Sequence, residues 1–292
     1  MLTHIQMETL IDLLLDACMD SIKLLPFLMA AYVIMEYLEH KTSTKTRAVV
    51  RKAGRLGPLA GGLAGIFPQC GFSAAASNLY AGGIITMGTL LAVFLSTSDE
   101  MLPIFISEAV DARIVLVILG MKAVMGILTG FFVDFVFRFR PSPIRYKEIH
   151  TRCESEHCGC DRGIFRSALV HTGKIFLFIL LFTIVLNVLV ALIGEERLVA
   201  FMSGQPLLGP VLAGIVGLIP NCASSVVITQ LYLNEFISFG TMMSGLLVGA
   251  GAGLLVLFQT NRRWKENLLL LSILYVSGTV WGIFIDVITH YF

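Results

Sequence analysis

Two short segments place a proline, a side-chain amide and a cysteine next to one another inside long apolar runs. Residues 65–71 read GIFPQCG, and residues 217–223 read GLIPNCA. The thiolates of Cys70 and Cys222 would suit soft ions such as Cu(I), Zn(II) or trivalent arsenic. A site with only two thiolates binds modestly, which suits a protein that must release its cargo. The alternative is that both cysteines are small buried hydrophobic residues.

Polar neighbours of the two cysteines are expected to supply further ligands or helix caps. A helix that begins at each segment would also favour an anion or a thiolate, because its N-terminus carries partial positive charge. The residues assigned to this substrate site are Pro68, Gln69, Cys70, Ser73, Asn221, Cys222, Ser224 and Ser225.

A third polar segment, FLSTSDEMLP at residues 94–103, falls in the late part of an apolar run. Carboxylates are costly at that depth, and an ionisable residue within a membrane is a functional hypothesis by default. The two acids are therefore predicted to bind a cation or to carry a coupling proton, unless the helix ends first and they face water. The partner stretch at 246–255, LLVGAGAGLL, offers bendable backbone instead. The residues assigned to this part of the site are Ser96, Thr97, Ser98, Asp99 and Glu100.

The segment between the two apolar halves is rich in cysteine and histidine. Residues 150–160 read HTRCESEHCGC. Short tracts of this kind often bind metal, and a disulfide is not expected because cytosolic thiols stay reduced. The spacing matches no closed zinc fold. We predict a role in loading or sensing metal, with an incidental linker as the alternative. The candidate ligands are His150, Cys153, His157, Cys158 and Cys160.

The composition identifies the elements that must hold these residues. The chain has 292 residues, of which 56% are hydrophobic and 14% are charged, whereas a soluble domain carries about 25% charged residues. We therefore predict an all-α integral membrane protein. The charged residues Lys122, Asp134 and Asp286 are expected to be interfacial or snorkelling. The clearest helical runs are 21–38, 114–137, 172–193 and 268–289.

Several other classes of protein are not indicated. The net charge of +1 does not point to nucleic acid, and the chain has no P-loop motif for ATP. No basic region precedes the first apolar run, so this run is expected to stay as a helix and not to act as a signal peptide.

The two halves of the chain repeat one another. Residues 56–106 align with residues 208–258 without a gap, and this register pairs Cys70 with Cys222. Chance apolar matching would not pair proline, cysteine, tyrosine and aspartate at one offset. We predict three parts, which are a first transmembrane repeat at 1–140, a cytoplasmic linker at 141–163 and a second transmembrane repeat at 164–292.

Equivalent loops of the two repeats carry opposite charge. Residues 41–55 hold six Lys or Arg and no acid, whereas 194–205 hold two Glu and one Arg. The bias reverses in the next pair, where 107–113 is slightly acidic and 259–267 is basic. Since basic loops stay in the cytoplasm, the repeats are predicted to be inverted, with both termini outside and the linker inside.

Each repeat is expected to contain a helical hairpin that enters the membrane and returns. Residues 56–106 must cross an odd number of times, and three spans of about 20 residues do not fit. Pro68 and Gly71 would form one cusp and Pro220 the other. The alternative is a pair of ordinary proline-kinked helices. Broken backbone at membrane depth is tolerated where it lines a cavity, so the cusps are expected to meet near the midplane.

The two proline–cysteine motifs, with the Cys/His linker between them, resemble the ten-helix heavy-metal exporter family, whose members carry the labels arsenic efflux protein or manganese transporter. The chain is more distantly similar to arsenic-related permeases with a Pro-x-Cys motif in each half. The resemblance covers nearly the whole chain. It implies ten helical segments, five in each half, and the export of a metal.

These observations favour a secondary transporter that exports a thiophilic heavy metal or metalloid by alternating access, and not an enzyme. Two other functions stay open, which are a permease for a small organic or inorganic anion and a membrane thiol oxidoreductase. The expected partners are a metal or metalloid ion as substrate, a coupling proton and the lipid bilayer. No cofactor is expected. The expected location is the cell inner (plasma) membrane.

Overall fold

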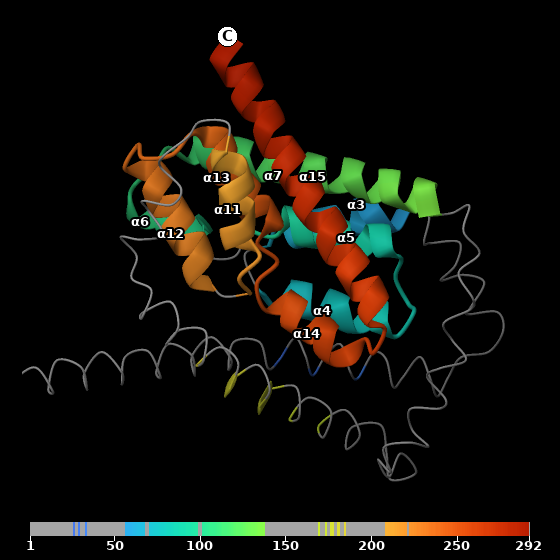
Figure 1. The fold of residues 1–292 in the computed structure, drawn as a ribbon. Coiled ribbons are helices and arrows are strands. Elements are labelled where there is room, and N and C mark those ends of the chain that lie inside the picture. The colour runs from blue at the N-terminus through green and yellow to red at the C-terminus, as the bar shows by residue number, and fades with distance from the viewer. Residues whose placement is uncertain are drawn as a thin grey trace, which may run out of the picture.

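The computed structural model describes residues 56–67, 70–98, 101–137, 208–220 and 222–291, together with isolated helical positions within 26–33 and 169–184. All regular structure in these residues is helical (Figure 1), as the composition predicts. The first half contains α3 (Gly57–Gly65), α4 (Cys70–Ala81), α5 (Met87–Ser96), α6 (Met101–Ser107) and α7 (Ala112–Phe137). The second half contains α11 (Gly209–Gly217), α12 (Cys222–Leu233), α13 (Phe239–Val248), α14 (Ala252–Thr260) and α15 (Trp264–Tyr291).

Three stretches of the described residues are long and apolar enough to cross a membrane. They are Ala112–Phe137, Phe239–Thr260 and Trp264–Thr289, with mean hydropathies of 2.2, 1.9 and 2.1. The first and third are the single helices α7 and α15, and the second is α13 followed by α14. Both single helices expose large apolar side chains, which suits contact with lipid. On α7 these include Leu116, Val117, Val124, Phe132 and Phe135.

The long apolar runs predicted at 114–137 and 268–289 therefore form helices close to those limits. The runs predicted at 21–38 and 172–193 lie largely outside the described residues, and their few described positions are helical.

Local sequence explains where the short helices begin. A proline occupies the first turn of α3 and of α11, where its missing N–H costs nothing and its fixed φ angle suits a helix. Thr86 and Ser238 precede α5 and α13, and each side-chain oxygen accepts a hydrogen bond from a backbone N–H inside the helix, at 3.1 Å. This is the usual N-cap arrangement.

The helices of the second half begin at positions equivalent to those of the first half. The first residues of α3 and α11 are Gly57 and Gly209, and those of α5 and α13 are Met87 and Phe239. The same separation relates α4 to α12 and α7 to α15, while α14 is slightly longer than its counterpart α6. The order and limits of the helices thus follow the register in which the sequence repeats.

The two halves also exchange contacts reciprocally. Helix α4 of the first half packs against α14 of the second, and α12 of the second half packs against α6 of the first (Figure 1). Between α7 and α15, the indole Nε1 of Trp281 donates a hydrogen bond of 3.0 Å to Oγ1 of Thr129. These two residues are 152 positions apart, so they occupy the same place in the two halves.

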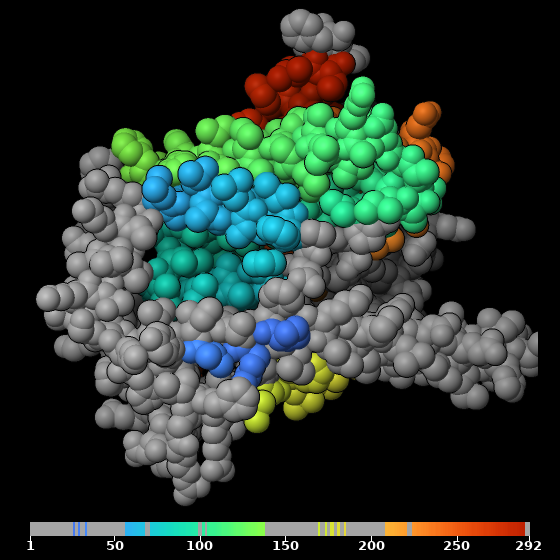
Figure 2. All heavy atoms as spheres, turned by 180° about the vertical axis from the view of Figure 1, so that it is seen from behind, coloured from blue at the N-terminus to red at the C-terminus, as the bar shows by residue number. Residues whose placement is uncertain are grey.

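Glycines let the helices approach closely. A Cβ atom at Gly217 in α11 would lie 2.3 Å from the carbonyl oxygen of Gly245 in α13, so the two backbones are in contact there. In the first half, a Cβ atom at Gly62 of α3 would lie 2.3 Å from the Ile127 side chain of α7. Figure 2 shows these two helices together on one face of the molecule, with α3 in blue and α7 in green. Small residues at such crossings are typical of membrane helices.

Candidate functional site

The two cysteines of the repeated motif begin equivalent helices. Cys70 is the first residue of α4 and Cys222 the first residue of α12. The preceding helices end at Gly65 and Gly217, so the helix is interrupted in both halves where the prolines predict a break. Pro68, Gln69, Asn221 and the two cysteine side chains lie outside the described residues. The approach of the two sulfurs therefore stays a prediction.

The first turn of α4 meets the second half of the chain. Ser73 is fully buried, and a Cβ atom at Gly253 of α14 would lie 2.8 Å from the Ser73 Cβ. One turn further on, the hydroxyl of Ser77 donates to the Gly253 carbonyl at 2.7 Å. In the other motif, the Ser224 hydroxyl donates to the Ile219 carbonyl at 3.3 Å, which ties the start of α12 to the end of α11. Ser225, predicted beside it, is half-buried, and its carbonyl accepts from Thr229.

A second interruption follows α5 and α13. Helix α5 ends at Ser96, whose hydroxyl donates to the Ala92 carbonyl at 2.7 Å, and α13 ends at Val248. The Ser98 hydroxyl donates to the Ile66 carbonyl at 3.1 Å, so this break lies against the end of α3 and close in sequence to the first cysteine motif. Asp99 and Glu100 lie outside the described residues, and their predicted roles stay predictions.

The Thr97 hydroxyl is a buried polar group at this break. Only 2% of the residue is exposed, and its Oγ1 has no hydrogen-bond partner in the part of the chain that the structure describes. Buried hydroxyls are normally hydrogen-bonded, so an unpaired one beside interrupted backbone indicates a position where a water molecule or an ion could bind.

Lys122 is not the interfacial or snorkelling residue that its type predicts. It lies in the middle of α7 with 1% of its surface exposed. Its ammonium donates to the backbone carbonyl of Thr97 and, at 2.8 Å, to that of Leu246. The sequence marks Lys122 as unusual, because it is the only charged residue between Arg113 and Asp134, but it does not indicate the bonding partners. A charge at such a depth marks function by default.

Asp134 and Asp286, which the sequence predicts to be interfacial or snorkelling, have equivalent hydrogen-bond partners in the two halves. Asp134 accepts hydrogen bonds from the Gly88 N–H at 2.8 Å and from the Thr86 hydroxyl at 2.6 Å. Asp286 accepts from the Gly240 N–H at 2.8 Å and from the Ser238 hydroxyl at 2.7 Å. Each carboxylate therefore holds the N-terminus of the interrupted helix in its own half, where the helix dipole favours negative charge.

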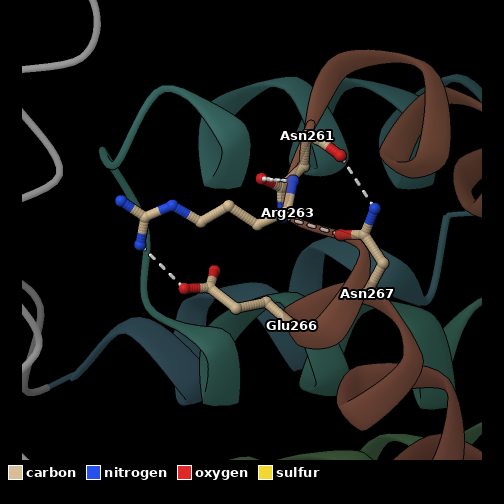
Figure 3. Close-up of polar contacts among 4 residues, drawn as sticks. All are labelled: Asn261, Arg263, Glu266 and Asn267. Atoms are coloured by element: carbon tan, nitrogen blue, oxygen red, sulfur yellow. Dashed lines mark hydrogen bonds and ion pairs between the residues drawn. The ribbon is translucent and has the colours of Figure 1, made fainter.

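The basic junction between α14 and α15 is held by side-chain amides (Figure 3). Asn261 and Asn267 are both buried, and the Asn261 Nδ2 donates to Oδ1 of Asn267 at 2.7 Å. The Asn267 Nδ2 returns a bond to the Asn261 carbonyl at 2.8 Å. Arg263 pairs with Glu266 at 2.9 Å, so this arginine charge is partly matched within the junction.

The predicted Cys/His metal tract lies outside the described residues. Its ligands His150, Cys153, His157, Cys158 and Cys160 stay predictions. Within the described ranges, no group of three or more His, Cys, Asp or Glu side chains is placed to hold a metal ion.

A family model matches the chain over residues 7–195 and again over residues 174–291. Its description is "Putative, 10TM heavy-metal exporter". The chain belongs to this family. Membership makes it a multi-pass membrane protein of a transporter class, and the family's description names a heavy metal as what is exported. No curated protein and no solved structure matches the chain.

Proposed function

We propose that this family member exports a thiophilic heavy metal or metalloid from the cytoplasm by alternating access. The observation that carries the proposal is the pair of equivalent helix interruptions, each followed at once by a helix that begins with cysteine. Thiolates are the preferred ligands of soft ions, and a helix N-terminus favours the ionised thiol. Cys70 and Cys222 would hold the ion, with Gln69 and Asn221 beside them.

The packing of the two halves supports a site shared between them. Helices α4 and α14 and helices α12 and α6 exchange contacts reciprocally, and Thr129 meets its own equivalent, Trp281. Such relations are expected for two repeats around a pseudo-two-fold axis. With the opposite charges of equivalent loops, they favour inverted repeats, whose binding sites lie near the midplane at interrupted helices.

Charge and proton balance would come from the break after α5. Asp99 and Glu100 follow Ser98, whose hydroxyl bonds to the end of α3. We assign to these carboxylates the charge compensation of the metal, or the proton that exchanges with it. The Cys/His tract would collect the metal on the cytoplasmic side of the inner membrane.

The test is a metal-accumulation panel in cells that express the wild type or the Cys70→Ala/Cys222→Ala pair. The wild type should lower the cellular content of at least one thiophilic ion, and the pair should restore the content found without the protein. Cys18→Ala is the matched control, since this cysteine lies outside both proposed sites. Equal accumulation of every ion in all strains would overturn the proposal.

A second candidate function is a permease for a small anion. The helix N-termini that begin at Cys70 and Cys222 favour it, because the N-terminus of a helix attracts negative charge. The same double-cysteine variant separates the two functions, because anion transport should persist in it.

The thiol oxidoreductase has its own test, which is alkylation of the two thiols. If alkylation showed that they cycle between oxidised and reduced forms, this function would be favoured over both others.

A further inference from the structure

Lys122 brings one positive charge to the ends of two interrupted helices, one from each half. Thr97 is the residue that follows the last turn of α5, and Leu246 lies in the last turn of α13. The Lys122 ammonium donates to both backbone carbonyls. Contact with Leu246 crosses between the halves, because α7 belongs to the first and α13 to the second.

The carbonyls at the end of a helix form a ready cation site. The last four carbonyls of a helix lack partners within the helix, and they carry the negative end of its dipole. In transporters with interrupted helices, such ends coordinate Na⁺ or H⁺. Carbonyl oxygen is a hard ligand that suits alkali and alkaline-earth ions, so this position differs in chemistry from a thiolate site for the cargo.

Two further observations single out this position. The hydroxyl of Thr97 is buried without a hydrogen-bond partner in the described part of the chain, so a third oxygen lies on the same residue. The position equivalent to Lys122 in the second half is Leu274, which is fully buried. A single ammonium therefore contacts helix ends from both halves. The two halves differ at this position, although their helices are otherwise equivalent.

We propose that the carbonyl oxygens of Thr97 and Leu246 form an alkali-cation site whose resident occupant is the ammonium of Lys122. The side chain replaces the free Na⁺ or K⁺ that such helix ends would otherwise bind. Transport by this chain then needs neither ion, and removal of the ammonium creates a requirement for one. The inference goes beyond the proposed metal export, since it depends on neither the cargo nor the direction of transport.

The first test measures the thermal stability of the purified full-length protein in chloride salts of equal ionic strength. Lys122→Ala should melt lower than the wild type in choline, and its Tm should rise in Na⁺, K⁺ or methylammonium, because a ligand of the folded state stabilises it. The wild-type Tm should be the same in all four salts. Leu274→Ala, which opens a cavity at the equivalent position, should melt lower without any preference among the salts.

Two results in this assay would overturn the inference. One is a Lys122→Ala protein whose Tm is indifferent to the cation, and the other is a wild-type Tm that rises in Na⁺ or K⁺. If Lys122→Ala yields no folded protein in choline, purification in methylammonium decides the matter. Folded protein there supports the site, and its absence there as well overturns it.

The second test measures export into vesicles that contain choline as the only monovalent cation. Lys122→Met keeps the length of the side chain but not the charge, and it should lose about tenfold or more in rate, the size expected for a hydrogen bond to a charged group. Lys122→Arg should retain most of the rate. A wild-type rate for Lys122→Met in choline would contradict the inference. The stability assay contains no heavy metal. Its result can therefore be interpreted even if the protein does not export one.

Discussion

Asp134 and its equivalent Asp286 stabilise the helices that they cap. Asp134→Ala would leave the Gly88 N–H and the Thr86 hydroxyl without this acceptor, whose oxygens lie 2.8 and 2.6 Å away. We expect a loss of about 1–3 kcal/mol in the free energy of unfolding, the cost of an unsatisfied buried polar group. The measurement is the Tm of the purified protein in detergent.

Asp134→Asn is the matched control for this prediction. It keeps an oxygen acceptor for the Gly88 N–H, so it should lose less stability than Asp134→Ala, and it removes the charge that favours the helix N-terminus. A Tm for Asp134→Ala equal to that of the wild type would show that the carboxylate does not hold the helix.

Residue types alone predicted part of this site. The prolines and cysteines of the motifs mark helix interruptions, because proline cannot continue the hydrogen-bond ladder of a helix. The roles of Lys122 and Asp134 could not be assigned in this way, because both depend on which backbone groups from distant helices end beside them. A lysine near the middle of an apolar run is a signal of function, but its partners come from the fold.

At the scale of the elements, the close crossing of α11 and α13 requires glycines, because glycine has no side chain. A Cβ atom at Gly217 would lie 2.3 Å from the Gly245 carbonyl oxygen, and neither backbone can give way as a flexible side chain would. Gly217→Ala should destabilise the protein by about 1–3 kcal/mol, as overpacking does, which outweighs the gain of about 1 kcal/mol in helix propensity. The Tm of the purified variant measures the balance.

Gly120→Ala is the matched control, because it makes the same glycine-to-alanine change where there is free space. Gly120 lies within α7, and an added Cβ atom there would have no atom within 4 Å. This variant should keep or raise the Tm because it gains helix propensity alone. If Gly217→Ala melted like Gly120→Ala, the close approach of α11 to α13 would be wrong.

The sequence predicted the interruptions that follow α5 and α13 only in part. The glycine-rich stretch at 246–255 indicated bendable backbone, and Gly251 does adopt a φ of 52°, which glycine reaches without strain. The equivalent stretch at 94–103 has no glycine, and its proline comes last, so the sequence left open whether the helix ends before Asp99. The end of α5 there depends instead on hydroxyl groups and on Lys122, which bond to backbone carbonyls near the break.

At the scale of the whole molecule, the sequence register and the packing describe the same relation. A repeat at a fixed offset predicts equivalent helices but not how the halves meet. The bond between Trp281 and Thr129 brings one pair of equivalent residues together, which favours an axis between the halves. Whether this axis lies in the membrane plane depends on which side each loop faces.

Labelling of two introduced cysteines tests that orientation. Glu108 lies between α6 and α7, Lys265 lies in the first turn of α15 beside the equivalent junction, and both are exposed. Inverted repeats place these junctions on opposite sides of the membrane, with the basic one inside. In intact cells, a membrane-impermeant maleimide should therefore label Glu108→Cys above the wild-type background, while Lys265→Cys should gain label only after the cells are opened. Parallel repeats would place both junctions on one side, so equal labelling of the two variants in intact cells would exclude inversion.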